Sequence, residues 1–245
     1  MSEKELTQFV TRLQSSAGDN LENVVLFGSA ATSEFSPEFS DINLLCVLAD
    51  LSIQKLASLG PTIRWWMRRK HPAPLLFTGE ELERSADVFA IEFLDIKQHH
   101  RVLFGEDVFS RVQVRLDLHQ RQLRHELRTK LLLLRERFVI ADGNRQKTVD
   151  LLLHSISSFL TLFRHALIAL GEQAPSSKQE ILEQSASTLG FDKLVFVQLL
   201  EIREGKRDKK SLNPNDAFAR YCSAIEHVAR SVDALPISPN LEKQL

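Results

Sequence analysis

Two short apolar runs lie close together near the start of the chain, and turn and acidic residues border them. Residues 24–27 (VVLF) stop at Gly28-Ser29, and residues 42–48 (INLLCVL) are entered through Asp41. Continuous apolar runs of this length are typical of strands that are buried on both faces. We therefore expect two strands of one sheet, with polar residues gathered where one strand ends and the next begins.

These bordering residues have the chemistry of a site for a nucleotide and a metal. A glycine lets the backbone approach a ligand closely, and Ser29 adds a hydroxyl and an amide. Side chains alternate along a strand, so Asp41 and Asn43 are expected to face the same way. Two oxygen ligands beside a Gly-Ser turn suit Mg²⁺ and a nucleoside triphosphate. The simpler alternative is that Gly28-Ser29 is only a turn and Asp41 only a strand-entry residue.

The order Gly28-Ser29, residues 30–40, Asp41-Ile42-Asn43 resembles the signature of the polymerase-β-type nucleotidyltransferase superfamily. In that signature a Gly-Ser pair precedes an Asp-x-Asp or Asp-x-Glu pair that holds metal. Asn43 departs from it, because an amide oxygen can bind a metal but brings no charge. The resemblance implies an α+β chain: a nucleotidyltransferase-fold mixed sheet with flanking helices, followed by an all-α antiparallel helical bundle.

A third apolar run, residues 89–96 (FAIEFLDI), contains acidic residues and is interpreted as a strand. Burying the carboxylate of Glu92 in the middle of a strand is costly unless it has a partner. The superfamily places its third metal carboxylate on a strand of this kind, so the resemblance implies that place for Glu92. Asp95 would project from the other face and is the weaker candidate.

From residue 111 onward the pattern is helical only. Apolar residues at helical spacing predict long helices over residues 111–138 and 148–170, followed by shorter ones. Short connections between such helices are typical of an antiparallel bundle of about four or five helices. We therefore expect three segments: a nucleotidyltransferase-fold domain at 1–110, a helical bundle at 111–236 and a loose tail at 237–245.

The charge of the chain is divided in the same way. Residues 1–110 hold 10 basic and 16 acidic residues, which gives −6, and the remaining 21 basic and 16 acidic residues give +5. An acidic part and a basic part suggest two domains that face each other across a charged cleft.

Glu126 and Lys130 lie four residues apart on the first predicted bundle helix, so they share a helix face. They could form a simple surface ion pair, worth about 0.3–0.5 kcal/mol. Kanamycin nucleotidyltransferase-like enzymes also join this fold to a helical domain, and their metal strand is similar to residues 40–47. In them, a Glu and a Lys at this spacing act as general base and phosphate contact. The resemblance implies these roles for Glu126 and Lys130.

Together these resemblances imply an enzyme that transfers an NMP from an NTP to a hydroxyl of a small molecule or a protein. ATP is the expected NTP, and Mg²⁺ or Mn²⁺ the expected metal. The implied residues are, for catalysis, Asp41, Glu92 and Glu126; for nucleotide binding, Gly28, Ser29 and Lys130; and for metal binding, Asp41, Asn43 and Glu92. The alternative is a weak or inactive member that serves as a nucleotide-binding or partner-binding module, of a regulatory or antitoxin-like kind. Asn43 favours that alternative.

Composition limits the remaining function classes. No apolar run reaches the length of a membrane span, and the first residues lack the apolar core of a signal peptide. Cys46 and Cys222 fall in a predicted strand and helix, as buried small hydrophobes do. We therefore expect a cytoplasmic protein without a membrane partner. One short basic run at residues 64–71 is weak support for nucleic-acid binding, so nucleic acid is not an expected partner, whereas a homodimer remains open.

Overall fold

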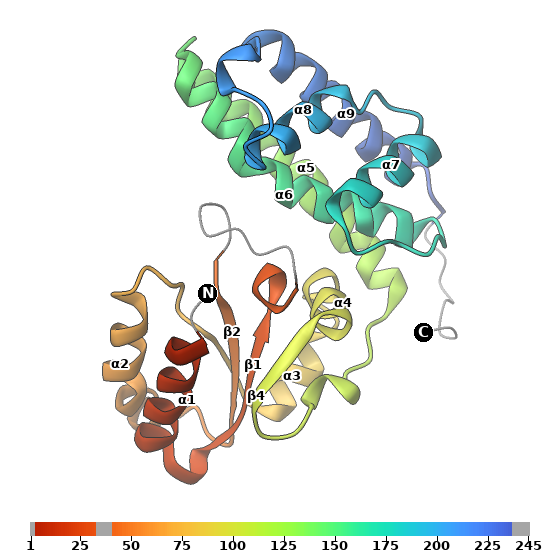
Figure 1. Cartoon of the computed structure of the whole chain (residues 1–245). Coiled ribbons are helices and arrows are strands. Elements are labelled where there is room, and N and C mark those ends of the chain that lie inside the picture. Colours follow the sequence, from red (N-terminus) through yellow and green to blue (C-terminus); the bar gives the residue numbers. More distant parts are fainter. Residues whose placement is uncertain (1–2, 33–40, 237–245) are drawn as a thin grey trace. The chain divides into compact units, whose positions relative to one another are not determined.

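The computed structural model describes residues 3–32 and 41–236, and the chain divides into two compact units (Figure 1). The first unit comprises Met1–Arg115 and the second Leu116–Leu245. The predicted tail at 237–245 lies outside the described residues.

The first unit is built on a mixed sheet, which in the described residues has the strand order β3-β2-β1-β4. The strands are β1 (Leu21–Phe27), β2 (Asn43–Leu48), β3 (Leu75–Phe77) and β4 (His100–Phe104). β1 is antiparallel to both β2 and β4, whereas β2 and β3 are parallel. Helices flank this sheet and further helices follow it, which confirms the predicted α+β fold class.

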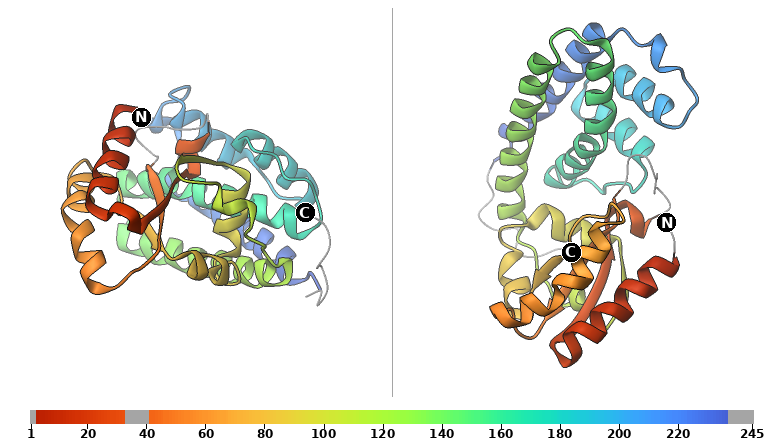
Figure 2. Two further views of the ribbon diagram at one scale, coloured as in Figure 1. Left: turned by 90° about the horizontal axis from the view of Figure 1, so that it is seen from below. Right: turned by 90° about the vertical axis from the view of Figure 1, so that its left-hand side faces the viewer.

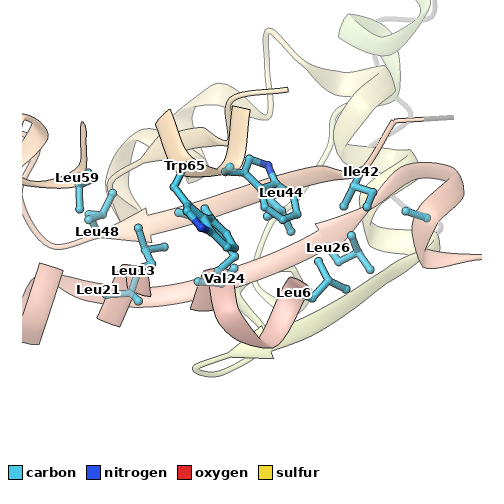
Figure 3. Packing of buried hydrophobic residues seen from close by; sticks show 14 residues of the cluster. Leu6, Leu13, Leu21, Val24, Leu26, Ile42, Leu44, Leu48, Leu59 and Trp65 are labelled. Atoms are coloured by element: carbon cyan, nitrogen blue, oxygen red, sulfur yellow. The ribbon is translucent and has the colours of Figure 1, made fainter. Parts of the chain in front are cut away.

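Helices cover both faces of the sheet because β1 and β2 carry apolar side chains in every position of their centres. Val24, Leu26, Leu44 and Cys46 pack against α1 (Glu3–Ala17) and α2 (Ile53–Met67). Figure 2 shows these two helices beside the strands, and Figure 3 shows Val24, Leu26 and Leu44 within this cluster. Trp66 of α2 is fully buried there, with its ring 4.8 Å from that of Phe9.

The alternate residues of the same strands, Val25, Leu45 and Val47, pack on the opposite face. Their partners come from α3 (Gly79–Ser85), from α4 (Ala90–Gln98) and from the 3₁₀ turn η3 (Val108–Ser110). Alternate residues of a strand point to opposite faces of the sheet. A continuous apolar run therefore packs against helices on both faces.

The predicted strand at residues 89–96 is wrong: these residues enter helix α4, and the strand that joins the sheet is β4. Ala90, Ile91, Phe93 and Ile96 are the buried residues of α4. Ile91 and Phe93 fit the period of a strand, whereas Ala90, Phe93 and Ile96 recur at the three-residue spacing of one helix face. A short apolar run of this kind does not by itself separate the two structures.

The second unit is helical throughout its regular structure. Its helices are α5 (Leu116–Ala141), α6 (Arg145–Ala169), α7 (Lys178–Leu189), α8 (Leu194–Arg203) and α9 (Pro214–Asp233). α6 lies at the centre and contacts each of the others. Asn144, Ser177 and Asn213 cap α6, α7 and α9 by accepting a backbone N–H, which satisfies amides that would otherwise lack a partner.

By length and composition, α6 is the one helix in the described part of the chain that could cross a membrane. Of its apolar window, 61% is buried inside the structure, as in a core helix. This central position accounts for its apolar composition, since a helix that is packed on several sides buries most of its surface.

Two histidines meet in the core between α5 and α6. His119 Nε2 lies 2.9 Å from His165 Nδ1, and both side chains are buried. Burial, with a smaller contribution from His165, lowers the pKa of His119 from its ordinary 6.5 to about 3. The folded second unit therefore keeps this imidazole neutral in mildly acidic solution.

This buried pair predicts a loss of stability in acid. Below pH 6.5 the unfolded chain binds a proton at His119, whereas the folded chain binds it only near pH 3. The free energy of unfolding should therefore fall as the pH drops through this window, by about 2 kcal/mol between pH 7.5 and 5. Urea unfolding followed by far-UV circular dichroism, at several pH values, measures this slope.

Two variants identify the source of the slope. His119→Leu should flatten it between pH 6.5 and 5, whereas His154→Gln, at an exposed histidine of α6, should leave it unchanged. An unaltered slope in His119→Leu would show that other groups cause the acid sensitivity.

Candidate functional site

The Gly-Ser and Asp-x-Asn motifs meet at one edge of the sheet. β1 ends at Phe27, which pairs with Asn43 at the start of β2 and with His100 at the start of β4. The 3₁₀ turn η2 (Gly28–Ala31) follows β1 directly. The antiparallel arrangement therefore brings the end of β1 and the beginnings of its two neighbours together.

Gly28 and Asn43 are in close contact at this edge. Gly28 has a φ of +73°, and a Cβ atom built on it would lie 3.1 Å from the amide nitrogen of Asn43. A left-handed φ and a tight neighbour both favour glycine. The amide nitrogen of Asn43 therefore faces the turn, and its oxygen is on the other side of the amide group.

The other two residues of the motifs adjoin this contact: Ser29 follows Gly28, and Asp41 lies two residues before Asn43. The Ser29 carbonyl accepts hydrogen bonds from the backbone amide of Thr32 at 3.2 Å and from its hydroxyl at 3.1 Å. These bonds close the turn that holds the Ser29 side chain. Asp41 is exposed and lies two residues before the first residue of β2.

The side chain of Asp41 is within electrostatic range of His71, which precedes β3 at the same edge of the sheet. Burial lowers the pKa of His71, and the negative charges of Glu5 and Asp41 oppose that shift. The segment that leads into β3 from His71 reads His-Pro-Ala-Pro-Leu, so this neighbour of β2 brings no carboxylate to the edge. Within the described residues there is no group of three or more His, Cys, Asp or Glu that could hold a metal.

Glu92 does not occupy a strand. It lies in the first turn of α4 with an exposed side chain, so the strand alignment that assigned it the third metal carboxylate is wrong. Asp95 also lies on α4.

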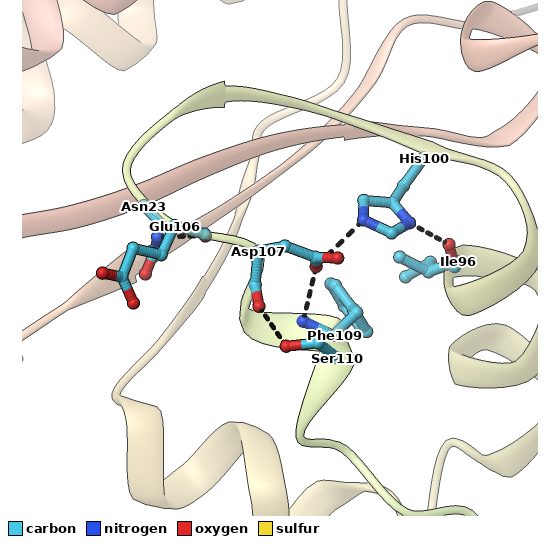
Figure 4. Close-up of polar contacts among 7 residues, drawn as sticks. All are labelled: Asn23, Ile96, His100, Glu106, Asp107, Phe109 and Ser110. Carbon is cyan, nitrogen blue, oxygen red and sulfur yellow. Dashed lines mark hydrogen bonds and ion pairs between the residues drawn. The ribbon is translucent and has the colours of Figure 1, made fainter.

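The strand after α4 begins instead with His100, which sequence reasoning did not place at the edge. Its Nδ1 lies 2.7 Å from the Ile96 carbonyl and its Nε2 lies 3.0 Å from Asp107 Oδ1 (Figure 4). The same oxygen of Asp107 accepts the amide of Phe109 at 3.0 Å. His100 therefore ties the start of β4 to α4 and η3.

Glu126 and Lys130 share one face of α5, as their spacing predicts. Lys130 Nζ lies 3.3 Å from Glu126 Oε2, and both side chains are partly exposed. They belong to the second unit, and a position opposite the Gly28-Ser29 turn stays a prediction.

A contact between Gly28 and Asn43 can be tested by a matched pair of glycines. Gly28 and Gly18 both have positive φ, but a Cβ on Gly18 would meet no atom within 4 Å. Both alanine variants should lose about 1–2 kcal/mol for the left-handed backbone. Gly28→Ala should lose more, because the Asn43 amide must also move.

Urea unfolding of the two variants, and of each in an Asn43→Ala background, measures this difference. Equal losses in Gly28→Ala and Gly18→Ala would show that Asn43 does not press on the turn. A larger loss in Gly28→Ala that disappears with Asn43→Ala would confirm the contact.

Comparison with known proteins supports the fold. No protein-family model and no curated protein matches the chain. Among solved structures, the chain is similar to spectinomycin adenyltransferase AAD(9) from Enterococcus faecialis, which was crystallised with ATP and spectinomycin. The sequences are 13% identical, the TM-score is 0.57, and the match covers 95% of this chain and 100% of the other. The likeness therefore extends over both units.

Proposed function

Because the chain has the nucleotidyltransferase fold, we propose that it transfers an NMP from an NTP to a hydroxyl of a small-molecule acceptor. One observation carries the proposal: the Gly28 turn lies directly against Asn43, so the two motifs of the signature form a single edge. The similar adenyltransferase, crystallised with ATP and spectinomycin, supports ATP as the nucleotide and a small molecule as the acceptor.

The Gly-Ser turn would bind the triphosphate. Gly28 presents backbone without a side chain, so a phosphate can approach closely, and Ser29 offers a hydroxyl and an amide as donors. These donors bind the phosphates without taking part in bond breaking. Their contribution is to hold the α-phosphorus in position for attack.

The donor atoms at the start of β2 fit a hard divalent cation. Asp41 brings a carboxylate and Asn43 an amide oxygen, both of which suit Mg²⁺ or Mn²⁺. When bound there, the metal would neutralise charge on the phosphates. With one carboxylate in place of two, the pair attracts a cation less strongly than an Asp-x-Asp pair does.

The second unit would supply the remaining groups. Glu126 would accept the proton of the acceptor hydroxyl, which makes the oxygen a better nucleophile. Lys130 would pair with a phosphate as a point charge. Lys130 Nζ and Glu126 Oε2 are 3.3 Å apart, so the two groups lie next to each other on α5.

A second candidate function has its own support. Asn43 is neutral, β3 brings no acid to the edge, and Glu92 lies on a helix rather than a strand. A site with so few carboxylates could bind a nucleotide, or a partner protein, without transferring NMP. This candidate is the regulatory, catalytically weak member.

Asp41 separates the two candidates. In an active enzyme, Asp41→Asn should reduce transfer at least about 100-fold, or ~2.7 kcal/mol, because the site loses its one charged ligand. Glu92→Gln, a matched removal of a carboxylate from α4, should leave transfer within about twofold. The assay is transfer of labelled NMP from each NTP, with Mg²⁺ or Mn²⁺, to a panel of hydroxylated small molecules.

Three outcomes of this assay distinguish the two candidate functions. Transfer that survives Asp41→Asn would contradict the metal role of Asp41. If the wild type transfers nothing but binds NTP, and Asp41→Asn or Ser29→Ala weakens that binding, the regulatory candidate is supported. If it neither transfers nor binds NTP, a nucleotide function is excluded.

Asn43 gives a prediction in the opposite direction. Asn43→Asp should tighten Mg²⁺ binding, because a second charge is added next to Asp41, and transfer should be equal or faster. Without metal, the two carboxylates repel, so the free energy of unfolding should fall slightly. Calorimetric titration with Mg²⁺ measures the first effect. Weaker Mg²⁺ binding would show that residue 43 does not face the metal.

A further inference from the structure

A cavity of about 350 Å³ lies in the first unit, at the end of the sheet away from the Gly28 turn. Asn23 of β1 and Val47 of β2 line it, and the two residues are paired in the sheet. Val47 follows Asn43 by four strand residues, so the cavity is about 13 Å along the strands from the candidate functional site. We call it the far-end cavity. Its volume is within the range of small-molecule sites in proteins.

Part of the wall of the far-end cavity is apolar. Val47, Leu82 of α3 and Val108 of η3 line it, and all three belong to the packing on this face of the sheet. Gly79 lines it as well, and a Cβ atom built there would meet only Glu22 Oε2, at 4.0 Å. The space beside Gly79 is therefore open, and a ligand in it can bury hydrocarbon against the apolar wall.

The charge at the far-end cavity is negative. Its charged lining residues are Glu22, Glu83, Glu106 and Arg111, which leaves a net charge of −2. Arg111 Nη2 lies 3.1 Å from Glu106 Oε2, so the one positive charge is already paired. The charges of Glu22 and Glu83 are in excess, and an excess of this kind attracts a cation.

Asn23 adds a hydrogen-bond acceptor to this wall. Its side chain is only 5% exposed, and its amide nitrogen donates to the Glu106 carbonyl at 2.6 Å (Figure 4). A carbonyl only accepts, so the amide nitrogen must face Glu106 and the amide oxygen must face the other way. Within residues 3–32 and 41–236, no hydrogen bond reaches this oxygen, and it is not sealed inside the protein. A donor in the far-end cavity would satisfy it.

We propose that the far-end cavity binds a small organic cation, namely a primary ammonium group on an apolar body. The ammonium group donates to Asn23 Oδ1 beside Glu22 and Glu83, and the apolar body lies against Val47 and Val108. A bare metal ion fits less well, because the described residues include no group of three or more His, Cys, Asp or Glu that could hold one. This site is separate from the Gly28 turn, so the proposal does not depend on NMP transfer.

A set of three related compounds tests the chemistry of the site. Benzylammonium is charged and has N–H donors, benzyltrimethylammonium is charged without donors, and benzyl alcohol is neutral. Each is titrated to about 20 mM into the ¹⁵N-labelled full chain, without nucleotide or metal, and backbone amide NMR signals are followed. Benzylammonium should give saturable shifts at Gly79 and Gly105, which line the cavity, but not at Gly28. It should bind at least about threefold more tightly than the other two compounds.

Three variants locate the site, with Gly105 as the reporter signal. Gly79→Leu should abolish binding, because its side chain would occupy the open space beside Glu22. Glu22→Gln with Glu83→Gln should weaken binding about tenfold, since each exposed carboxylate contributes roughly threefold. Glu80→Gln is the matched control: Glu80 lies on α3 but does not line the cavity, so affinity should stay within about twofold. Circular dichroism confirms that each variant is folded.

Absence of saturable shifts at Gly79 and Gly105 overturns the proposal. Equal affinity for benzylammonium and benzyltrimethylammonium would show that the Asn23 oxygen accepts no N–H, which overturns it as well. Binding that persists in Gly79→Leu, or that is unchanged in the double glutamine variant, would place the ligand elsewhere.

Discussion

Burial of β1 and β2 on both faces is the constraint on which the first unit depends. Because consecutive residues of these strands enter opposite cores, neither strand can shift by one position without exchanging the two sets of side chains. The register of Phe27 with Asn43 is thereby fixed from the interior of the sheet. The site at its edge consists of polar groups, but apolar packing several residues away determines where they stand.

This dependence explains which parts of the site could be predicted from the sequence. Gly28, Ser29 and Asp41 flank two apolar runs, and Asn43 lies near the start of the second. Such runs have one reasonable interpretation as buried strands. Glu92 lies in a run of mixed character, where Ile91 and Phe93 fit both a strand and a helix. The choice there depends on what the segment packs against, namely the face of the sheet that carries Val25 and Leu45. Local sequence does not contain that information.

His100 was missed for the same reason: the local sequence around it did not indicate a strand. Its neighbours gave no strand signal as strong as the run before it, so sequence reasoning assigned the strand to residues 89–96 and passed over β4. In the structure its ring bridges the Ile96 carbonyl and the Asp107 carboxylate, two groups that become neighbours only after the chain reverses at Gly105. In the second unit, by contrast, long helical periodicity gave the correct class of structure, because a 25-residue amphipathic pattern leaves little ambiguity.

The distribution of aromatic residues gives each unit its own optical reporter. Both tryptophans of the chain lie on α2 in the first unit, whereas its single tyrosine, Tyr221, lies fully buried on α9 in the second. The Tyr221 hydroxyl is 3.1 Å from Ser155 Oγ of α6. Indole emission therefore reports on the first unit alone, and phenol absorbance reports on the second. The order in which the two units unfold can thus be followed in the intact chain, without separating the units or attaching a label.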